Sequence, residues 1–405
     1  MRKLFFLFIC VFLFLALLAC TEKEKGGNES ESAVTSASTT AYVTTTKAPV
    51  TTAVNIGNPL NSHYKSAAYP RNPWDMILFD GRLYVGGGDY SANSEAMAFY
   101  AYDIESGEWL CTGHTSDHAI SKFKVIDGDL YAPGIDSLED WSTGNYYMLK
   151  KGGEWQTFSD VPGGVHVYDI AKTKSGLLIG IGTGASTFTP ALYKDSLTGR
   201  YTELPLIRDG KSVLASEEYG YTRLRIYDFF NVGDEVYAFC AATATSGRTE
   251  YAIYKYEGER FLFVSTLANA GISTFSLNGR RLWQNFFGTS VYAYGNCYVT
   301  SGKLFKTRDF KSSQHISAPD DRIISDLLCR GGIVYVLGFS NTRSDIYENV
   351  VWSLDENDSF SEILRFETKG GYALSFECDT DSFYFGIGST DGTWATGYVR
   401  QVYVD

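Results

Sequence analysis

Met76-Ile-Leu-Phe79, Asp80-Gly81 and Leu83-Tyr-Val-Gly-Gly-Gly88 follow one another in the chain, and Phe99-Tyr-Ala-Tyr-Asp103 and Glu105-Ser-Gly-Glu-Trp109 come next. Each apolar stretch has the length of a β-strand, and the Asp-Gly and Ser-Gly pairs are typical of tight turns between strands. These residues therefore predict four short strands in succession.

The same unit recurs along the chain. Its first turn falls at Gly81, Gly128, Gly176, Gly233, Gly279, Gly332 and Asp381, with separations of 47, 48, 57, 46, 53 and 49 residues. Four short strands at this period are typical of the blades of a β-propeller. We predict an all-β, seven-bladed β-propeller over residues 55–405. Six or eight blades remain open because the fifth unit, around residues 291–298, is irregular.

The chain ends on the third strand of the last unit, so an earlier segment must supply the fourth. We expect residues 64–69 to do this and to close the ring by pairing the two ends of the domain. Deletion of residues 55–72 is then expected to destabilise the whole domain.

The composition limits the function classes. The 405 residues are 44% hydrophobic, 15% aromatic and 20% charged, which excludes disorder for most of the chain. The formal net charge of −12 disfavours a nucleic-acid partner, because phosphates repel an acidic surface. We expect the domain to be a monomer.

The N-terminus has the pattern of an export signal. A short cationic start is followed by an apolar run from Leu4 to Ala19, which is short for a membrane span. The run ends in Leu17-Leu18-Ala19-Cys20, which resembles the lipobox of bacterial lipoproteins. This resemblance implies cleavage after residue 19, lipidation of Cys20, and a bacterial cell-membrane location facing outside the cytoplasm. An ordinary secretory signal is the alternative.

Residues 20–54 lack a hydrophobic period, and residues 30–52 hold twelve Ser or Thr. Such a segment buries too little apolar surface to fold alone, so we predict a flexible stalk.

The first propeller unit resembles a kelch repeat, in which a glycine doublet ends the second strand and a Tyr and a Trp follow. Here these residues are Gly86-Gly87, Tyr102 and Trp109. The second unit keeps Tyr147 and Trp155, whereas the other units lack the doublet. The resemblance implies a kelch-like, degenerate propeller in which the aromatic residues pack between sheets.

Metal ligands are hard to find in this sequence. His114 and His118 are four residues apart, a metal-binding spacing on a helix, but their Gly-rich setting favours a loop between two units. Five widely spread cysteines follow Cys20 without a Cys-x-x-Cys pair, so we assign no metal site. The cofactor, if any, stays unassigned.

Four units open their first strand with an aspartate. These residues are Asp75, Asp169, Asp228 and Asp326. First strands of a propeller line the central channel, so the four carboxylates would form a ring that binds a cation, a sugar or a basic peptide. The alternative is that each carboxylate accepts hydrogen bonds from a neighbouring loop and fixes the spacing between sheets.

The loops after the second strands carry a second group of candidates. These residues are Tyr90, Asp136, Trp141, Arg248, Arg343 and Trp394. Such loops share one face of a propeller, where aromatic rings stack on sugars and arginines bind carboxylates.

No hydrolase elbow, zinc-protease, phosphate-loop or dinucleotide motif occurs. We therefore expect a membrane-anchored extracytoplasmic propeller that binds a glycan or a peptide on its loop face. A polysaccharide hydrolase or lyase on the same scaffold is one alternative, and a structural partner in envelope-protein assembly is another.

Overall fold

The computed structural model describes residues 48–65, 67–89, 95–139, 141–182, 189–214, 219–273, 276–277, 280–281, 290–389 and 396–404. All of them belong to one compact unit, Val43–Asp405. The predicted signal peptide, Cys20 and the stalk up to residue 47 lie outside the described residues. Among the residues described, no helix is both long enough and apolar enough to cross a membrane.

Two-residue turns connect the first and second strands of the first two units. Asp80 and Gly81 have φ of 50° and 76°, and Asp127 and Gly128 have 52° and 84°. Positive φ at both central residues is the geometry of the turn that suits the twist of a β-hairpin, and Asp-Gly adopts it readily. Each turn therefore joins the first two strands of a four-stranded meander.

Five separate sheets have four strands each, so the predicted all-β class is confirmed. Their strands are β2 (Met76–Phe79), β3 (Arg82–Val85), β5 (Ala98–Asp103) and β6 (Glu108–His114); β8 (Lys124–Ile126), β9 (Asp129–Pro133), β11 (Thr143–Leu149) and β12 (Trp155–Pro162); β25 (Ser290–Ala293), β26 (Asn296–Thr300), β27 (Leu304–Thr307) and β28 (Gln314–Ile316); β29 (Ile323–Arg330), β30 (Ile333–Arg343), β31 (Ile346–Leu354) and β32 (Phe360–Lys369); and β33 (Tyr372–Cys378), β34 (Ser382–Gly388), β35 (Tyr398–Tyr403) and β1 (Val54–Gly57).

The other four-stranded units are joined within one larger sheet of thirteen strands. It contains two four-stranded meanders and five short strands. The strands are β13 (His166–Lys172), β14 (Gly176–Gly182), β15 (Ala191–Asp195) and β16 (Tyr201–Glu203); β19 (Tyr221–Val232), β20 (Glu235–Ala244), β21 (Thr249–Tyr256) and β22 (Phe261–Thr266), with β17 (Leu206–Arg208) and β18 (Lys211–Ser212); and β4 (Gly87–Gly88), β7 (Asp117–Ile120) and β10 (Ile135–Ser137).

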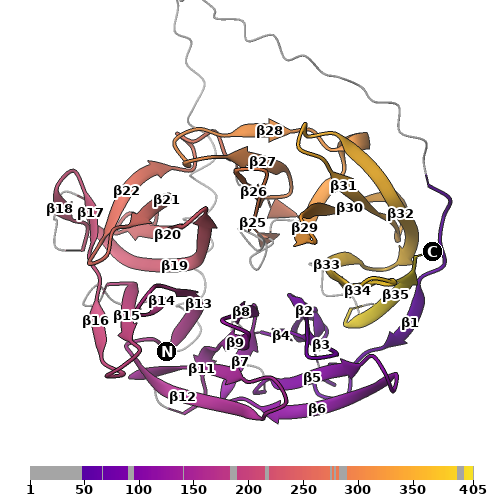
Figure 1. Ribbon diagram of the computed structural model, residues 1–405, viewed down its shortest axis with the longest axis horizontal. Helices are drawn as coiled ribbons and strands as arrows, with labels where there is room; N and C mark the ends of the chain where they lie inside the picture. Colours follow the sequence, from indigo (N-terminus) through magenta and orange to yellow (C-terminus); the bar gives the residue numbers. More distant parts are fainter. Residues whose placement is uncertain are drawn as a thin grey trace, which may run out of the picture. The chain divides into compact units, whose positions relative to one another are not determined.

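The predicted count of seven blades is therefore wrong: among the residues that the structure describes, five four-stranded sheets stand as separate blades. The reason is sideways pairing between units. β4 pairs with β7, β7 with β10, β10 with β13, and β14 with β19. We call these six strands the inner ladder. The sheets are nevertheless set around a circle with their first strands innermost, which is the arrangement of a β-propeller (Figure 1).

The two ends of the domain close the ring, but not through the predicted segment. β1 pairs antiparallel with β35, with Val54 opposite Gln401. Two residues of the predicted segment, Tyr64 and Ala68, instead pack inside, and the Tyr64 carbonyl accepts a hydrogen bond from Arg71 Nε at 2.6 Å. The stalk boundary at residue 54 stays a prediction, although the chain already contacts the domain at Ala48.

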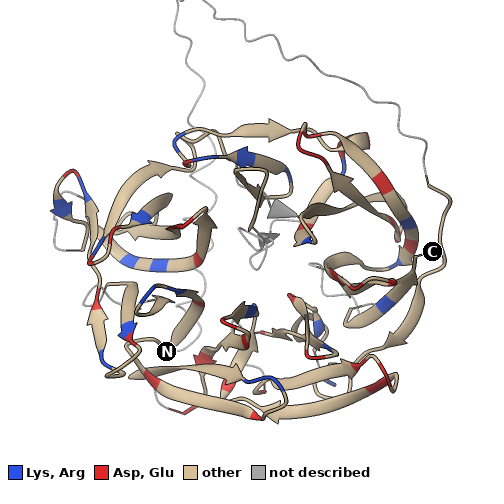
Figure 2. Cartoon of the chain, viewed as in Figure 1, with Lys and Arg blue, Asp and Glu red and all other residues tan. Residues whose placement is uncertain are grey.

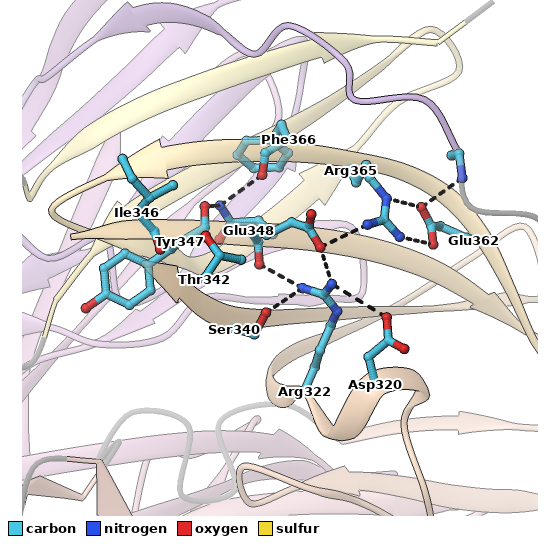
Figure 3. A network of polar contacts seen from close by, with 12 residues as sticks. Asp320, Arg322, Ser340, Thr342, Ile346, Tyr347, Glu348, Glu362, Arg365 and Phe366 are labelled. Atoms are coloured by element: carbon cyan, nitrogen blue, oxygen red, sulfur yellow. Dashed lines mark hydrogen bonds and ion pairs between the residues drawn. The ribbon is translucent and has the colours of Figure 1, made fainter. Parts of the chain in front are cut away.

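Residues 48–53, which we call the N-terminal strap, cross the edge of β32 before reaching β1. Ala48 N donates to Glu362 Oε1 at 3.0 Å, and Thr51 N donates to the Arg365 carbonyl at 2.8 Å. Beneath the strap, Arg365 binds both Glu362 and Glu348, and Arg322 also binds Glu348 (Figure 3). These largely buried charges pair with one another, as buried ions require.

Aromatic side chains fill the space between sheets. Phe99 of one sheet stacks on Trp155 of the next with ring centres 3.8 Å apart. Trp109 packs on the closing strand: its indole donates to the Ile56 carbonyl at 2.8 Å, and a Cβ at Gly57 would lie 2.4 Å from the ring nitrogen. The predicted packing of Trp109 and Trp155 between sheets is thus confirmed.

Candidate functional site

Three of the four predicted inner aspartates, Asp75, Asp169 and Asp326, bind backbone amides of two neighbouring units at once. Asp75 Oδ1 accepts a hydrogen bond from Met76 N at 2.9 Å, and Asp75 Oδ2 accepts one from Phe123 N at 2.6 Å. Phe123 directly precedes β8 of the next sheet. The carboxylate therefore joins the first strands of two neighbouring units.

The same double hydrogen bond recurs in two other units, where a β-bulge directly before the aspartate redirects its side chain. Asp169 accepts from Ile170 N at 2.8 Å and Phe229 N at 2.6 Å, and Asp326 accepts from Leu327 N at 2.9 Å and Phe376 N at 3.0 Å. These contacts fix the spacing between units. This is the structural role that the sequence analysis gave as the alternative to ligand binding. The ligand role of these aspartates stays a prediction.

Glu377 of β33 completes the pattern and was missed. It accepts hydrogen bonds from Cys378 N at 2.9 Å and from Leu78 N, across the closure, at 3.2 Å. Arg330 lies 3.1 Å from its Oε1. The sequence did carry a signal, because Glu377 is an acidic residue followed by an apolar one in the last unit. The predicted pattern contained only aspartates and therefore did not include this glutamate.

Lys122 directly precedes Phe123, whose amide binds Asp75. In another unit Asp228 holds the corresponding position, because it directly precedes Phe229, whose amide binds Asp169. The Lys122 ammonium lies 2.6 Å from Asp228 Oδ1 and 3.6 Å from Asp169 Oδ2. Lys124 lies 2.6 Å from Asp169 Oδ2. Lys122 and Lys124, at the start of β8, thus neutralise two aspartates from β13 and β19 of the large sheet, and Figure 2 shows basic and acidic segments at the inner ends of β8 and β13.

Burial sets the protonation of these acids. Burial raises the pKa of Asp228, and the adjacent Asp169 carboxylate raises it further, so Asp228 retains its proton more readily. Burial also opposes ionisation of Asp169, but the Lys122 and Lys124 ammonium groups outweigh it and lower the pKa of Asp169. Burial raises the pKa of Asp75 to about 7 despite its two amide hydrogen bonds.

The predicted loop residues lie on or directly beside the turns between second and third strands where the structure describes them. Trp141 follows β10, is 65% exposed and donates its indole N–H to the Ser137 carbonyl at 3.0 Å. Arg248 is exposed in the turn from β20 to β21, and Arg343 ends β30, 3.7 Å from Glu367. Tyr90 and Trp394 lie outside the described residues.

The two spaced histidines do not share a helix. His114 ends β6 and His118 lies in β7, so both histidines lie on strands and only the residues between them form the predicted connecting loop. Within the described ranges, no group of three His, Cys, Asp or Glu side chains is placed to hold a metal.

The inner ladder brings together a polar cluster that the sequence did not reveal. Asp136 of β10 is buried at a φ of 68°, with its Oδ1 3.6 Å from His166 Nδ1. Arg225 of β19 donates to Tyr227 Oη at 3.2 Å, and the ring of Tyr227 lies 4.6 Å from that of Tyr168. A buried non-glycine residue at positive φ is strained, and such strain is concentrated at functional sites.

A second buried carboxylate borders this cluster. Asp117 of β7 is fully buried, and its Oδ2 accepts hydrogen bonds from Tyr147 Oη at 2.5 Å and Asn145 Nδ2 at 3.0 Å. Burial raises the pKa of Asp117 to about 6. Its other oxygen makes no hydrogen bond to the described residues.

Comparisons with known proteins concern the fold alone. No protein-family model matches the sequence, and no curated protein matches it. A chain in the crystal structure of a mitotic checkpoint complex aligns with a TM-score of 0.50 at 9% identity, covering 95% of this chain and 99% of that one. The β-propeller domain of the Trilobed protease from Pyrococcus furiosus aligns with a TM-score of 0.44 at 10% identity, covering 81% and 92%.

Proposed function

We propose that the protein is a lipid-anchored extracytoplasmic β-propeller that binds a glycan or peptide ligand on the face formed by the turns between second and third strands. The observation that carries this proposal is Trp141. Its large ring is mostly exposed, yet its N–H is held by the Ser137 carbonyl, so it offers a fixed apolar surface. Fixed exposed aromatic rings suit stacking on sugars or apolar side chains at low entropic cost.

The binding proposal is tested with a glycan array and a peptide library probed with the purified chain. We expect Trp141→Ala to weaken the binding of any ligand found by about tenfold, equivalent to about 1.4 kcal/mol of lost stacking and burial. Leu197→Ala is the matched control, because Leu197 is 94% exposed in the turn from β15 to β16, at the opposite ends of the strands. Equal effects of the two substitutions, or binding only to envelope proteins, would contradict the proposal.

The anchor is tested separately. Cys20→Ser is expected to move the protein from the membrane fraction to the soluble fraction, because the acylated thiol is lost. Cys111→Ser, at an exposed cysteine within the domain, is expected to leave the protein in the membrane fraction. A Cys20→Ser protein that still sediments with membranes would show that another feature holds it there.

A further inference from the structure

A polar pocket opens at the turn that joins β27 to β28. Its volume is about 450 Å³, and every residue that lines it is polar, including Arg308, Asp309 and Ser312. Turns between third and fourth strands lie at the opposite ends of the strands from the turn that carries Trp141. The pocket is therefore separate from the proposed ligand face, and what it binds goes beyond the proposed function.

A buried aromatic side chain holds this turn in place. Phe310 is fully buried at a φ of 57°, and its ring centre lies 5.4 Å from that of Phe230 of β19. The Phe310 amide donates to Thr307 Oγ1 at 2.9 Å, and its carbonyl accepts a hydrogen bond from Ser265 Oγ at 2.5 Å. A non-glycine residue stays at positive φ only where such contacts compensate for the strain. The polar residues on either side of Phe310 are therefore carried on a fixed backbone.

The guanidinium of Arg308 is oriented by a buried amide. Arg308 Nε donates to Asn296 Oδ1 at 3.2 Å, and buried Asn296 donates from Nδ2 to the Tyr294 carbonyl at 2.8 Å. The two terminal nitrogens of exposed Arg308 make no hydrogen bond or ion pair with any side chain or backbone group in the described ranges. The Ser312 hydroxyl makes none there either. Arg308 and Ser312 therefore keep hydrogen-bond donors free for a ligand in the pocket.

The turn is basic although the protein is acidic. Residues 303–311 hold four basic side chains and one acidic one, whereas the whole chain has 35 basic and 47 acidic residues. The four basic residues are Lys303, Lys306, Arg308 and Lys311. Figure 2 shows basic segments on β27 and at the turn that follows it. Asp358 neutralises Lys306 through an ion pair, so a surplus of positive charge remains to attract an anion.

Asp309 is the acidic residue in the pocket lining. Its Oδ1 accepts a hydrogen bond from Lys311 N at 2.9 Å, which helps to shape the turn. Its negative charge opposes an anion in the pocket, and the basic residues around it outnumber it. Removal of this charge should therefore strengthen the binding of an anion and weaken the binding of a cation.

We propose that this pocket binds a phosphate group, with Arg308 and Ser312 as its main donors. The terminal nitrogens of an arginine bind two phosphate oxygens as a planar pair, and a serine hydroxyl donates to a third. A phosphate monoester carries a charge of about −1.5 to −2 and three acceptor oxygens. The basic turn therefore attracts it more strongly than a carboxylate, which has one charge and two oxygens.

The test is calorimetric titration of the purified full chain with inorganic phosphate, at about pH 7.5 and low ionic strength because salt screens exposed charges. We expect a dissociation constant of about 1 mM or lower, the affinity that a few charge-assisted hydrogen bonds supply. Acetate is expected to bind at least about tenfold more weakly.

Arg308→Gln is expected to weaken phosphate binding about tenfold or more, and Ser312→Ala about threefold. Arg200→Gln is the matched control, since it removes the same charge from the turn joining β15 to β16, the equivalent turn of another unit, and should leave the affinity unchanged. Thermal unfolding of each variant checks its folding. If Arg308→Gln does not fold, Ser312→Ala carries the test.

Asp309→Asn provides a change of opposite sign. Asparagine keeps the oxygen that accepts the Lys311 amide and loses the negative charge, so we expect phosphate to bind about threefold more tightly. A residue that only supports the turn would not increase affinity when it is replaced. No phosphate binding at about 20 mM, equal binding of acetate, equal losses in Arg308→Gln and Arg200→Gln, or weaker binding by Asp309→Asn would overturn the proposal.

Two soluble probes distinguish the sources of a phosphate group. Glucose 6-phosphate is compared with glucose, and dihexanoyl phosphatidic acid with dihexanoyl phosphatidylcholine, whose phosphate is capped by choline. Tighter binding of one phosphorylated probe than of inorganic phosphate, lost in Arg308→Gln, would assign the site to a sugar phosphate or to a lipid headgroup. Equal binding within both pairs would overturn the proposal. Each of these outcomes leaves the proposed function intact, because Trp141 lies at the other ends of the strands.

Discussion

Lys122 holds together three inner strands through one buried ammonium group. Replacement by methionine would leave Asp169 and Asp228 facing each other with only the more exposed Lys124 to compensate. We expect Lys122→Met to lower the free energy of unfolding by about 3 kcal/mol, the scale for breaking a buried ion pair.

The matched control is Lys172→Met, which removes an exposed lysine paired with exposed Asp127 at 3.0 Å. Surface pairs contribute about 0–1 kcal/mol, so little change is expected. Urea unfolding of the two variants beside the parent protein checks the difference. Equal losses would show that the inner cluster contributes no more than a surface pair.

Asp75 predicts a pH dependence of stability. Its pKa is raised to about 7 in the fold, against 3.8 in the unfolded chain, so the folded state retains the proton between those values. The contribution of Asp75 to stability is therefore fully present below about pH 4 and is lost as pH rises through 7.

The comparison with Asp75→Asn isolates this effect, because asparagine does not titrate. We expect the parent protein to lose stability relative to Asp75→Asn between pH 4 and pH 8, by at most about 4 kcal/mol at 1.36 kcal/mol per pKa unit. Denaturant titrations of both proteins across this range measure it. A difference that stays constant, or changes in the opposite direction, would mean that Asp75 is ionised in the fold throughout.

At the scale of the strand, β32 offers two glutamates in contrasting settings. Glu362 is 4% exposed, binds Arg365 and accepts the Ala48 amide of the N-terminal strap (Figure 3). Glu367, on the same strand, is 46% exposed and lies 3.7 Å from Arg343. We expect Glu362→Gln to cost about 3 kcal/mol and Glu367→Gln less than about 0.5 kcal/mol.

Proteolysis adds a local readout for the same pair. Cleavage near residues 48–53 is expected to accelerate in Glu362→Gln, since the strap loses its charged acceptor, and to stay unchanged in Glu367→Gln. Indistinguishable stabilities and cleavage rates would contradict the role of the buried network in holding the strap.

The sequence predicts the local elements of this fold well, but not the contacts between distant units. Turns such as Asp80-Gly81 and repeated aspartates such as Asp169 follow from local chemistry, and the structure places them as expected. The closing strand could not be predicted, because Val54–Gly57 is short and its first two residues are exposed, whereas residues 64–69 include two tyrosines. The Asp136, His166 and Arg225 cluster joins three units through sideways pairing, which no single-unit pattern encodes.

At the scale of the whole molecule, the ring depends on contacts that join its beginning to its end. β1 pairs with β35, Glu377 accepts the Leu78 amide, and Ser375 Oγ donates to the Pro73 carbonyl at 2.7 Å. Sheets that cover one another's faces leave no half with a complete core. The domain should therefore unfold as one cooperative unit.

Thermal unfolding of two shortened chains tests this closure most directly. One begins at residue 48 and keeps the strap and β1, and the other begins at residue 58 and lacks both. We predict a single sharp transition for the first and a transition lower by more than about 10 °C, or no cooperative transition, for the second. Identical melting of the two chains would contradict a ring closed by β1.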